Sequence, residues 1–435
     1  MRISTNMIYE LGSATLSRQQ VEQVKLQQHI SSGKRVLTPS DDPVAAASAL
    51  EITQARGLND QYHTNAGVAR DKLALEESAL ADATTLLQDV KTLAVYAGNA
   101  TLTDADKKGL AAELESHYRQ LLGIANRTDG NGLYLFSGYQ GATLPFSETA
   151  PGTVAYAGDS GSRNVQISAS RVLQVSDAGD AVFRAISSGN GSFDAAPGAG
   201  NTGSGVIGPG TVTDMVAWNA AANGKDFTIR FHVDNAVVPP VTTYDIVDNV
   251  NNVSLTTGAA PAPGPYLRSY TPGGTISLAR QAPPDTNPAA FDFGANVTID
   301  RVPASGDTFT IQASTDQDVF TTLHGLITTL RNAMGGTEAS AAAYQNALNS
   351  AMSNIDNAHD HVLTVRAQVG ARLKEVDIAQ STSEDLSLAY NQSLSRLQDL
   401  DYAKALSELA ARQTYFEAAQ KSFLTVTSLD LFKLL

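Results

Sequence analysis

Residues 73–94 read LALEESALADATTLLQDVKTLA, and their apolar side chains recur at alternating steps of three and four residues. The stripe consists of Leu73, Leu80, Ala83, Leu87, Val90 and Ala94, with Glu76 as the one polar interruption. This heptad pattern predicts a long helix that packs against another helix in a coiled coil. The stripe stops at Gly98-Asn99. Thr103–Asp106 then resembles a capping box that opens a further helix, although Asp stands where Glu or Gln is usual.

The C-terminal part of the chain carries a second long stripe. It consists of Leu348, Met352, Ile355, Val362, Val369, Leu373 and Val376, and it resumes in register at Tyr390, Leu394 and Leu397. Polar residues also fall on it, namely His359, Arg366, Gln380, Ser383 and Ser387. A helix over residues 340–380 would be roughly 60 Å long. After residues 399–401 the apolar phase changes, and a further stripe contains Tyr402, Leu406, Leu409, Phe416 and Phe423. We expect the rods from the two ends to pair.

The middle of the chain has a different character. All of the 16 prolines except Pro39 and Pro43 lie between Pro145 and Pro303. Short β-branched and aromatic runs such as DFTIRFHVD and DTFTIQAS alternate with turn clusters such as PGAGNTGSG. This pattern predicts a compact β domain with Trp218, the single tryptophan, in its core.

We therefore expect an α+β fold in which both chain ends form a long antiparallel coiled-coil rod around an inserted, mainly β domain. The expected parts are an N-terminal helix (1–40) that pairs with the C-terminus, the first half of the rod (41–145), the β domain (146–315), the second half of the rod (316–385) and a C-terminal helix (386–435).

The two extreme ends lack a complete apolar face of their own. Residues 1–32 carry only a thin stripe, Ile3, Met7, Ala14, Val21 and Val24, among Ser, Thr and Gln. So few apolar residues do not offset the entropy of ordering the segment. The tail SFLTVTSLDLFKLL (422–435) is by contrast apolar. One interpretation is that the two terminal segments fold against each other within a single chain. The pattern instead favours terminal segments that become ordered on assembly.

A connector, ISSGKRVLTPSDDP (30–43), separates the N-terminal helix from the rod. Gly33 suits the end of one helix, and Pro39 interrupts the helical pattern. Asp41 or Asp42 can cap the next helix, and Pro43 suits its first turn. An ordinary helix–loop–helix joint would show the same signals.

Composition excludes several classes of function. The 435-residue chain has a net charge of −14, and its basic pairs are isolated, so we expect no nucleic acid partner. It contains no cysteine, which excludes disulfides and thiolate chemistry. No apolar run reaches the roughly 18 residues of a membrane span, so we expect no membrane insertion. The N-terminus lacks the apolar stretch of a secretory signal peptide, which leaves the cytoplasm or export without a cleaved signal.

The sequence shows no catalytic, cofactor or metal motif. Of the seven histidines, only His359 and His361 suggest a metal site, but on a helix they would point roughly 200° apart. The glycine-rich stretches lack the ending of a phosphate-binding loop, and there is no G-x-S-x-G elbow. We expect no enzyme, cofactor or metal, although the β domain could hide a site built from distant residues.

Several stretches of the sequence carry a resemblance to a known family. The start MRISTNMIYE, the Gln-rich segment to Ile30 and SSGKRVLTPSDDPVAAASAL resemble the hook–filament junction proteins of the bacterial flagellum (hook-associated protein 3), in the flagellin superfamily. NGLYLFSGYQGATLPF resembles that family's entry into its outer domain. The resemblance covers roughly residues 1–146 and, more loosely, 316–435. Flagellins share part of the connector, but Pro39-Ser40 before the aspartates and Pro43-Val44 after them favour the junction family.

The resemblance implies a structural adaptor ring outside the cell, linking hook-associated protein 1 to flagellin. It also implies copies of the chain as partners, export by the flagellar type III apparatus and a cytoplasmic chaperone at the C-terminal helix. The connector (Gly33, Pro39, Asp41, Asp42 and Pro43) would join an inner helical layer to an outer one. The implied assembly interface is Ile3, Met7, Ala14, Val21, Val24, Tyr390, Leu394, Leu397, Tyr402, Leu406, Leu409, Phe416 and Phe423. A flagellin, or a surface-exposed binding or adhesion protein, is the alternative.

Overall fold

The computed structural model describes residues 5–220, 223–333 and 336–428, which form two compact units. The first unit contains the residues up to Gly67, Gln166–Arg171 and the residues from Val376 onward. The second contains Val68–Val165 and Val172–Glu375. Two helices, α2 (Pro43–Ala97) and α7 (Glu338–Gln398), have residues in both units.

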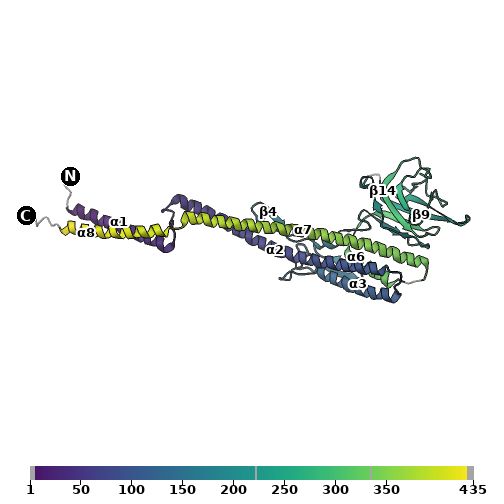
Figure 1. Cartoon of the computed structure of the whole chain (residues 1–435), viewed down its shortest axis with the longest axis horizontal. Helices are drawn as coiled ribbons and strands as arrows, with labels where there is room; N and C mark the ends of the chain where they lie inside the picture. Colours follow the sequence, from purple (N-terminus) through teal and green to yellow (C-terminus); the bar gives the residue numbers. More distant parts are fainter. Residues whose placement is uncertain (1–4, 221–222, 334–335, 429–435) are drawn as a thin grey trace, which may run out of the picture. The chain divides into compact units, whose positions relative to one another are not determined.

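In the first unit, helix α1 (Thr5–Ser32) lies antiparallel beside α8 (Tyr402–Ser428), as Figure 1 shows beside the labels N and C. The beginning of α2 packs there against the end of α7 through small and polar side chains. Asn59 Nδ2 donates to the Ser383 carbonyl at 2.7 Å, and Ser383 Oγ donates back to the Asn59 carbonyl. This part of the helix pair is therefore held by hydrogen bonds as well as by buried alanines.

In the second unit, the predicted heptad stripe of α2 is buried. Its six apolar members, Leu73, Leu80, Ala83, Leu87, Val90 and Ala94, have no exposed surface. They share the interior with apolar residues of α7, Leu348, Ile355, Val362 and Val369. Arg366, a polar residue on the α7 stripe, reaches Glu77 of α2 at 2.8 Å. The α+β class with paired terminal helices around a β-rich insertion is confirmed.

Helix α3 (Asp104–Ala125) begins at the capping box that the sequence predicts. The Thr103 side chain accepts from the Asp106 backbone N–H, and the Asp106 carboxylate accepts from the Thr103 backbone N–H. Helix α3 packs against α6 (Val319–Arg331), where Tyr118 and Phe320 meet edge to face at 6.2 Å between ring centroids. Aspartate therefore serves here in place of the usual glutamate.

The main strand pairs of the central insertion, β1-β2, β9-β10, β13-β14, β6-β15 and β9-β15, are antiparallel. Its larger sheet has the order β11-β10-β9-β15-β6 with β12 on β10, and a second sheet has the order β13-β14-β7 with β8 on β14. The remaining strands pair as β1-β2, β3-β4 and β5-β16. The bounds are β1 (Phe146–Ala150), β2 (Thr153–Tyr156), β3 (Asn164–Ser168), β4 (Arg171–Gln174), α4 (Gly179–Phe183), β5 (Ile186–Ser187), β6 (Phe193–Pro197), β7 (Val206–Ile207), β8 (Thr211–Val212), α5 (Met215–Trp218), β9 (Asp226–Asp234), β10 (Val241–Asp248), β11 (Val253–Ser254), β12 (Arg268–Ser269), β13 (Thr275–Ala279), β14 (Asp292–Asp300), β15 (Thr308–Ala313) and β16 (Asp316–Gln317).

The insertion has its own aromatic core. Trp218 is 1% exposed and lies 5.2 Å from the Phe193 ring, so its predicted core position is confirmed. A buried ion pair joins Arg268 to Asp285 at 2.7 Å, and the guanidinium also donates through Nη1 to the Ser277 carbonyl and through Nη2 to the Ala279 carbonyl. Because every charged group in this cluster has a partner, its role is structural.

Candidate assembly site

The α1·α8 pair is joined by a seam that mixes Leu and Phe side chains with glycine, glutamine and arginine. From α1 the less exposed residues are Gly12, Leu16, Gln19, Gln23 and Leu26, and from α8 they are Ala405, Leu409, Arg412, Phe416 and Phe423. Phe423 covers Gly12 so closely that a Cβ there would lie 2.5 Å from the ring, and its ring also lies tilted against that of Tyr9, with 5.3 Å between the centroids. The spacing is that of a coiled coil, but Gln and Arg occupy core positions.

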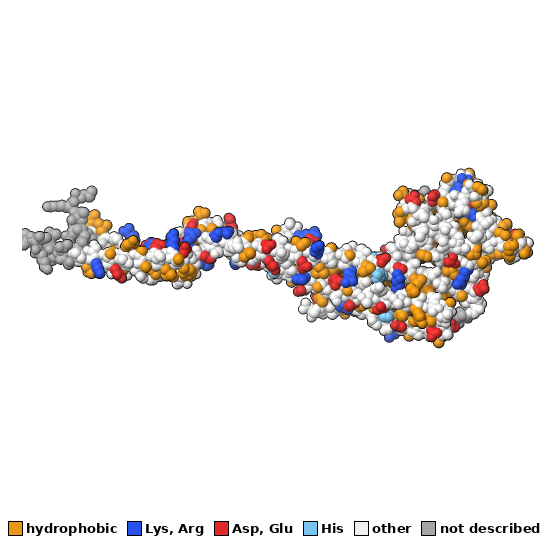
Figure 2. All heavy atoms as spheres, viewed as in Figure 1, with side chains coloured by type: hydrophobic (Ala, Val, Ile, Leu, Met, Phe, Trp, Pro, Cys, Tyr) orange, Lys and Arg blue, Asp and Glu red, His pale blue; other side chains and the backbone are white. Residues whose placement is uncertain are grey.

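Both helices also carry apolar side chains outside this seam. On α1, Val21 is 65% exposed, and Met7, Leu11 and Val24 are exposed too. On α8, Leu406 is 53% and Tyr415 67% exposed. Hydrophobic side chains accordingly appear on the outer surface of this pair in Figure 2. Single exposed apolar residues are ordinary, but several on both members of a two-helix pair form an apolar surface.

The residues expected from sequence to form the interface divide into two groups. Leu409, Phe416 and Phe423 lie half-buried in the α1·α8 seam, and Tyr390, Leu394 and Leu397 are half-buried at the end of α7. Met7, Ala14, Val21, Val24 and Leu406 are exposed, and Tyr402 is 50% exposed with its hydroxyl against Gly33. Ile3 lies outside the described residues. Sequence reasoning missed Gly12, Leu16 and Leu26, whose heptad spacing is visible but is interrupted by Gln19 and Gln23.

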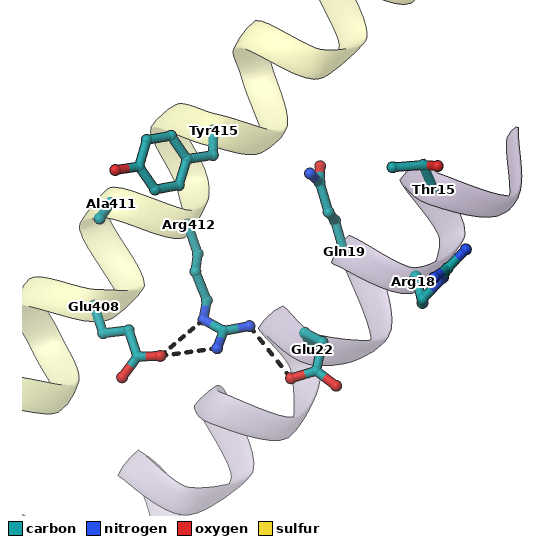
Figure 3. A pocket seen from close by; sticks show the side chains of 8 residues that line it. All are labelled: Thr15, Arg18, Gln19, Glu22, Glu408, Ala411, Arg412 and Tyr415. Atoms are coloured by element: carbon teal, nitrogen blue, oxygen red, sulfur yellow. Dashed lines mark hydrogen bonds and ion pairs between the residues drawn. The ribbon is translucent and has the colours of Figure 1, made fainter. Parts of the chain in front are cut away.

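A cavity of about 460 Å³, lined by polar, charged and apolar side chains, opens beside the seam, as Figure 3 shows. Arg412 of α8 bridges two carboxylates there, Glu408 at 2.8 Å and Glu22 of α1 at 3.3 Å. Hydrogen bonding to Glu408 raises the pKa of Arg412 above its ordinary value. Gln19 points from α1 toward α8, and its Oε1 is buried without a partner among the described residues. At least one polar group in the wall of this cavity therefore lacks a hydrogen bond within the described residues.

The connector holds its shape through its two aspartates. Asp41 accepts from the Leu37 and Thr38 backbone N–H groups and pairs with Lys25 of α1 at 2.8 Å. These contacts, Lys25 first, hold the pKa of Asp41 far below its ordinary value. Asp42 accepts from the Ala45 N–H at 3.0 Å and so caps α2, which begins at Pro43.

The segment that links α1 to α2 is hydrogen-bonded to the segment that links α7 to α8. The Arg35 N–H donates to the Gln398 carbonyl at 2.6 Å, and its guanidinium donates to the Leu397 carbonyl at 2.9 Å. The Leu400 N–H donates to the carbonyl of Gly33, which has φ +69°. A Cβ at position 33 would lie 2.8 Å from Tyr402 Oη, which favours glycine there. The α1–α2 and α7–α8 breaks therefore form one joint.

No metal or membrane feature appears in the described part of the chain. No group of three or more His, Asp or Glu side chains is placed there to hold an ion. His361 Nε2 instead lies 2.7 Å from the Ala181 carbonyl. None of the helices in the described ranges has the length and apolar character that crossing a bilayer requires.

Comparison with known proteins matches both helical ends and the full length. The bacterial flagellin N-terminal helical region matches residues 3–141, and the C-terminal helical region matches residues 337–434. The flagellar hook-associated protein 3 of Escherichia coli (strain K12) is 28% identical over 434 residues, which cover 100% of this chain and 99% of the relative. The crystal structure of hook-associated protein-3 from Legionella pneumophila has 27% identity and a TM-score of 0.67, covering 80% of this chain and 98% of that one. That of FlgL from Xanthomonas campestris has 29% identity and a TM-score of 0.66, covering 79% and 99%.

Paired terminal helices around a β-rich insertion, with both flagellin helical regions present, define a flagellin-type structural subunit. Within this class the chain belongs to the flagellar hook-associated protein 3 family. It is a structural component of the flagellum at the hook–filament junction, outside the cell, and not an enzyme. The flagellin and adhesin interpretations are therefore not retained.

Proposed function

We propose that copies of this chain form an adaptor ring, with hook-associated protein 1 against one edge and flagellin against the other. In this ring the outward apolar side chains of α1 and α8 pack against neighbouring subunits. The observation that carries the proposal is that Val21, Val24 and Leu406 are exposed on a two-helix pair whose own seam contains Gln and Arg.

The energetics favour burial of these residues in an assembly. Covering an exposed Val or Leu side chain contributes roughly 1.5–3 kcal/mol. Arg412, Gln19 and Gln23 weaken the intramolecular seam, because polar core residues reduce coiled-coil stability. The pair therefore gains further apolar burial when a neighbour covers its outer face.

The joint at residues 33–42 and 399–401 would set where the terminal helices lie relative to the rest of the ring. Its contacts combine backbone hydrogen bonds with the Lys25–Asp41 and Arg35–Asp42 pairs. Such a doubly bonded joint suits an adaptor, because it lets the α1·α8 pair form a separate helical layer while the two chain breaks stay together.

Before export, a cytoplasmic chaperone would cover the C-terminal apolar segment 422–435. The support is its composition, with Phe, Leu and Val at most positions and a single basic residue. Removing residues 422–435 should abolish co-elution with the chaperone, whereas replacing Gln413 and Glu417 by Ala should preserve it. Chaperone binding by the truncated chain would contradict this assignment.

The main test replaces Val21 and Leu406 by Gln in the full-length chain. Both side chains face outward, so the purified monomer should keep its circular dichroism spectrum while cells lose stable junctions and filaments. The matched control replaces Gln20 and Ser407, which are also exposed, by Ala. Normal filaments on cells that carry the Val21 and Leu406 variant would contradict the proposed interface. Replacing Leu406, Leu409 and Phe416 together by polar residues should be more severe, since it also removes the intramolecular seam.

Immunogold microscopy tests the ring itself. Antibody raised to residues 189–314, which lie within the insertion, should label a single band between hook and filament on intact flagella. Cross-linking followed by mass spectrometry should then recover peptides of hook-associated protein 1 and of flagellin from that band. Label along the whole filament, or cross-links to only one of the two proteins, would contradict the adaptor arrangement.

A further inference from the structure

Glu76 has a carboxylic acid side chain, yet it is buried among the apolar side chains of the α2 stripe. It is 2% exposed, and Leu73 and Leu80, one turn to either side, are fully buried. Burying a carboxylate among apolar side chains is costly unless hydrogen bonds and an opposite charge compensate it. The partners of Glu76 therefore decide which protonation state the fold accepts.

Those partners come from two other elements of the same unit. The Asp177 backbone N–H, in the segment between β4 and α4, donates to Glu76 Oε1 at 2.9 Å. Arg372 of α7 donates through Nη2 to both carboxylate oxygens of Asp177, at 3.0 and 2.7 Å. Glu76 Oε2 and Arg372 Nη1 are both buried without a partner among the described residues. The Arg372 guanidinium is thus paired with Asp177 rather than with Glu76.

The charge balance follows from these contacts. If Glu76 were ionised, two carboxylates would share one guanidinium, and the interior would carry an excess negative charge. If Glu76 is protonated, its O–H can donate to the Asp177 carboxylate, and the cluster is neutral. Burial and then the Asp177 charge raise the pKa of Glu76 to about 8, while the Asp177 N–H and Arg372 oppose the shift.

We propose that Glu76, Asp177 and Arg372 form a proton-dependent clasp that holds residues 175–178 against α2 and α7. The clasp is closed while Glu76 carries its proton, and it opens when that proton passes to solvent. The neighbouring acids are already engaged elsewhere: Glu77 with Arg366 at 2.8 Å and Asp180 with Arg184 at 3.3 Å. Gln174 donates to Asp177 Oδ1 at 2.7 Å and keeps that carboxylate in place.

The direction of the pH effect follows from the raised pKa of Glu76. In the open state Glu76 meets water and titrates at its ordinary 4.5, whereas in the closed state it titrates at about 8. The closed state therefore binds the extra proton between these values. The ratio of open to closed should rise roughly tenfold per pH unit from about pH 5 to about pH 8, and then level off.

Amide hydrogen exchange on the full-length chain measures this directly, because the Asp177 N–H is itself a bond of the clasp. After correction for intrinsic exchange rates, protection of the peptide containing Asp177 should fall between pH 5 and pH 8 in the unchanged protein. In Glu76→Gln it should be independent of pH, since the amide N–H replaces the carboxyl O–H toward Asp177. Glu77→Gln is the matched control and should keep the original pH dependence.

Circular dichroism at pH 5 establishes that each variant is folded. Asp177→Asn supplies a second route should Glu76→Gln fail to fold, because removing the second carboxylate charge should flatten the same profile. Protection that does not change with pH in the unchanged protein would overturn the proposal. An equal pH dependence in Glu76→Gln, or in Asp177→Asn where that variant alone folds, would overturn it as well.

Discussion

Two helical seams in this molecule share heptad spacing but differ in what fills it. In the second unit, α2 and α7 bury Leu, Val and Ala completely. In the first unit, α1 and α8 meet through Leu and Phe side chains interspersed with Gly12, Gln19, Gln23 and Arg412, while Val21 and Leu406 face outward. The α2·α7 seam is therefore complete within one chain, whereas the α1·α8 pair has its unused apolar surface where a neighbouring subunit can cover it.

The largest effect on the isolated protein should come from Leu80→Ala in the α2·α7 seam. Leu80 has no exposed surface, so truncation removes buried methyl groups and leaves a cavity, at a cost of about 3 kcal/mol in the free energy of unfolding. Chemical denaturation monitored by circular dichroism measures this loss. Val21→Ala on α1 is the comparison and should change the same quantity by less than about 0.5 kcal/mol. Equal losses for the two variants would remove the distinction between the seams.

A smaller effect should follow from Thr103→Ala at the start of α3. The change removes one half of the capping box and leaves the Asp106 N–H without its acceptor, at a cost of about 1 kcal/mol. Hydrogen exchange should show faster opening of the first turn of α3 with no change in α1. Thr101→Ala, two residues earlier and outside the box, is the control. Unchanged protection at Asp106 would show that the cap contributes nothing.

The smallest effect on the isolated chain should come from Asp41→Asn in the connector. The pKa of Asp41 is lowered in the folded chain, chiefly by Lys25. The contribution of the ionised carboxylate to the stability of the fold is therefore complete above pH 3.8, the ordinary pKa, and is lost as the pH falls below 3.8 toward the lowered pKa. The variant should behave at neutral pH as the unchanged chain does in strong acid, with faster exchange at the Leu37 and Thr38 amides. Ser40→Ala tests whether any change in this turn has the same result. Unaltered exchange in Asp41→Asn would show that the Lys25 contact does not hold the connector.

Sequence reasoning succeeded where local pattern and burial coincide. The α2 stripe, the Thr103 cap and Trp218 follow from residue type and spacing alone, and the structure confirms them. The strand order of the insertion could not be predicted, because pairings such as β15 with β6 join residues more than 100 positions apart. Glu76 was visible only as an interruption, since its partner Asp177 lies 101 residues away.

The candidate site was only partly predictable for a related reason. An apolar stripe identifies residues that need a partner, but it does not say whether that partner lies in the same chain. Phe416 and Val21 have the same kind of signal, yet Phe416 is in the intramolecular seam and Val21 faces outward. Gln19 and Gln23 hid the α1 seam, because polar residues at core positions remove the pattern on which a sequence prediction depends.

The most direct test of the account is cross-linking between copies in assembled flagella. The chain has no cysteine, so a single Val21→Cys substitution gives one reactive thiol per subunit. Any cross-linked dimer must therefore join residue 21 of one copy either to another copy of this chain or to a different neighbouring protein. With a short bis-maleimide, Val21→Cys should give dimers of this chain in intact junctions, whereas Glu113→Cys on the exposed face of α3 should remain monomeric. If Val21→Cys stays monomeric in intact junctions and reacts freely with a soluble maleimide, the outward face of α1 is not the surface that joins the subunits.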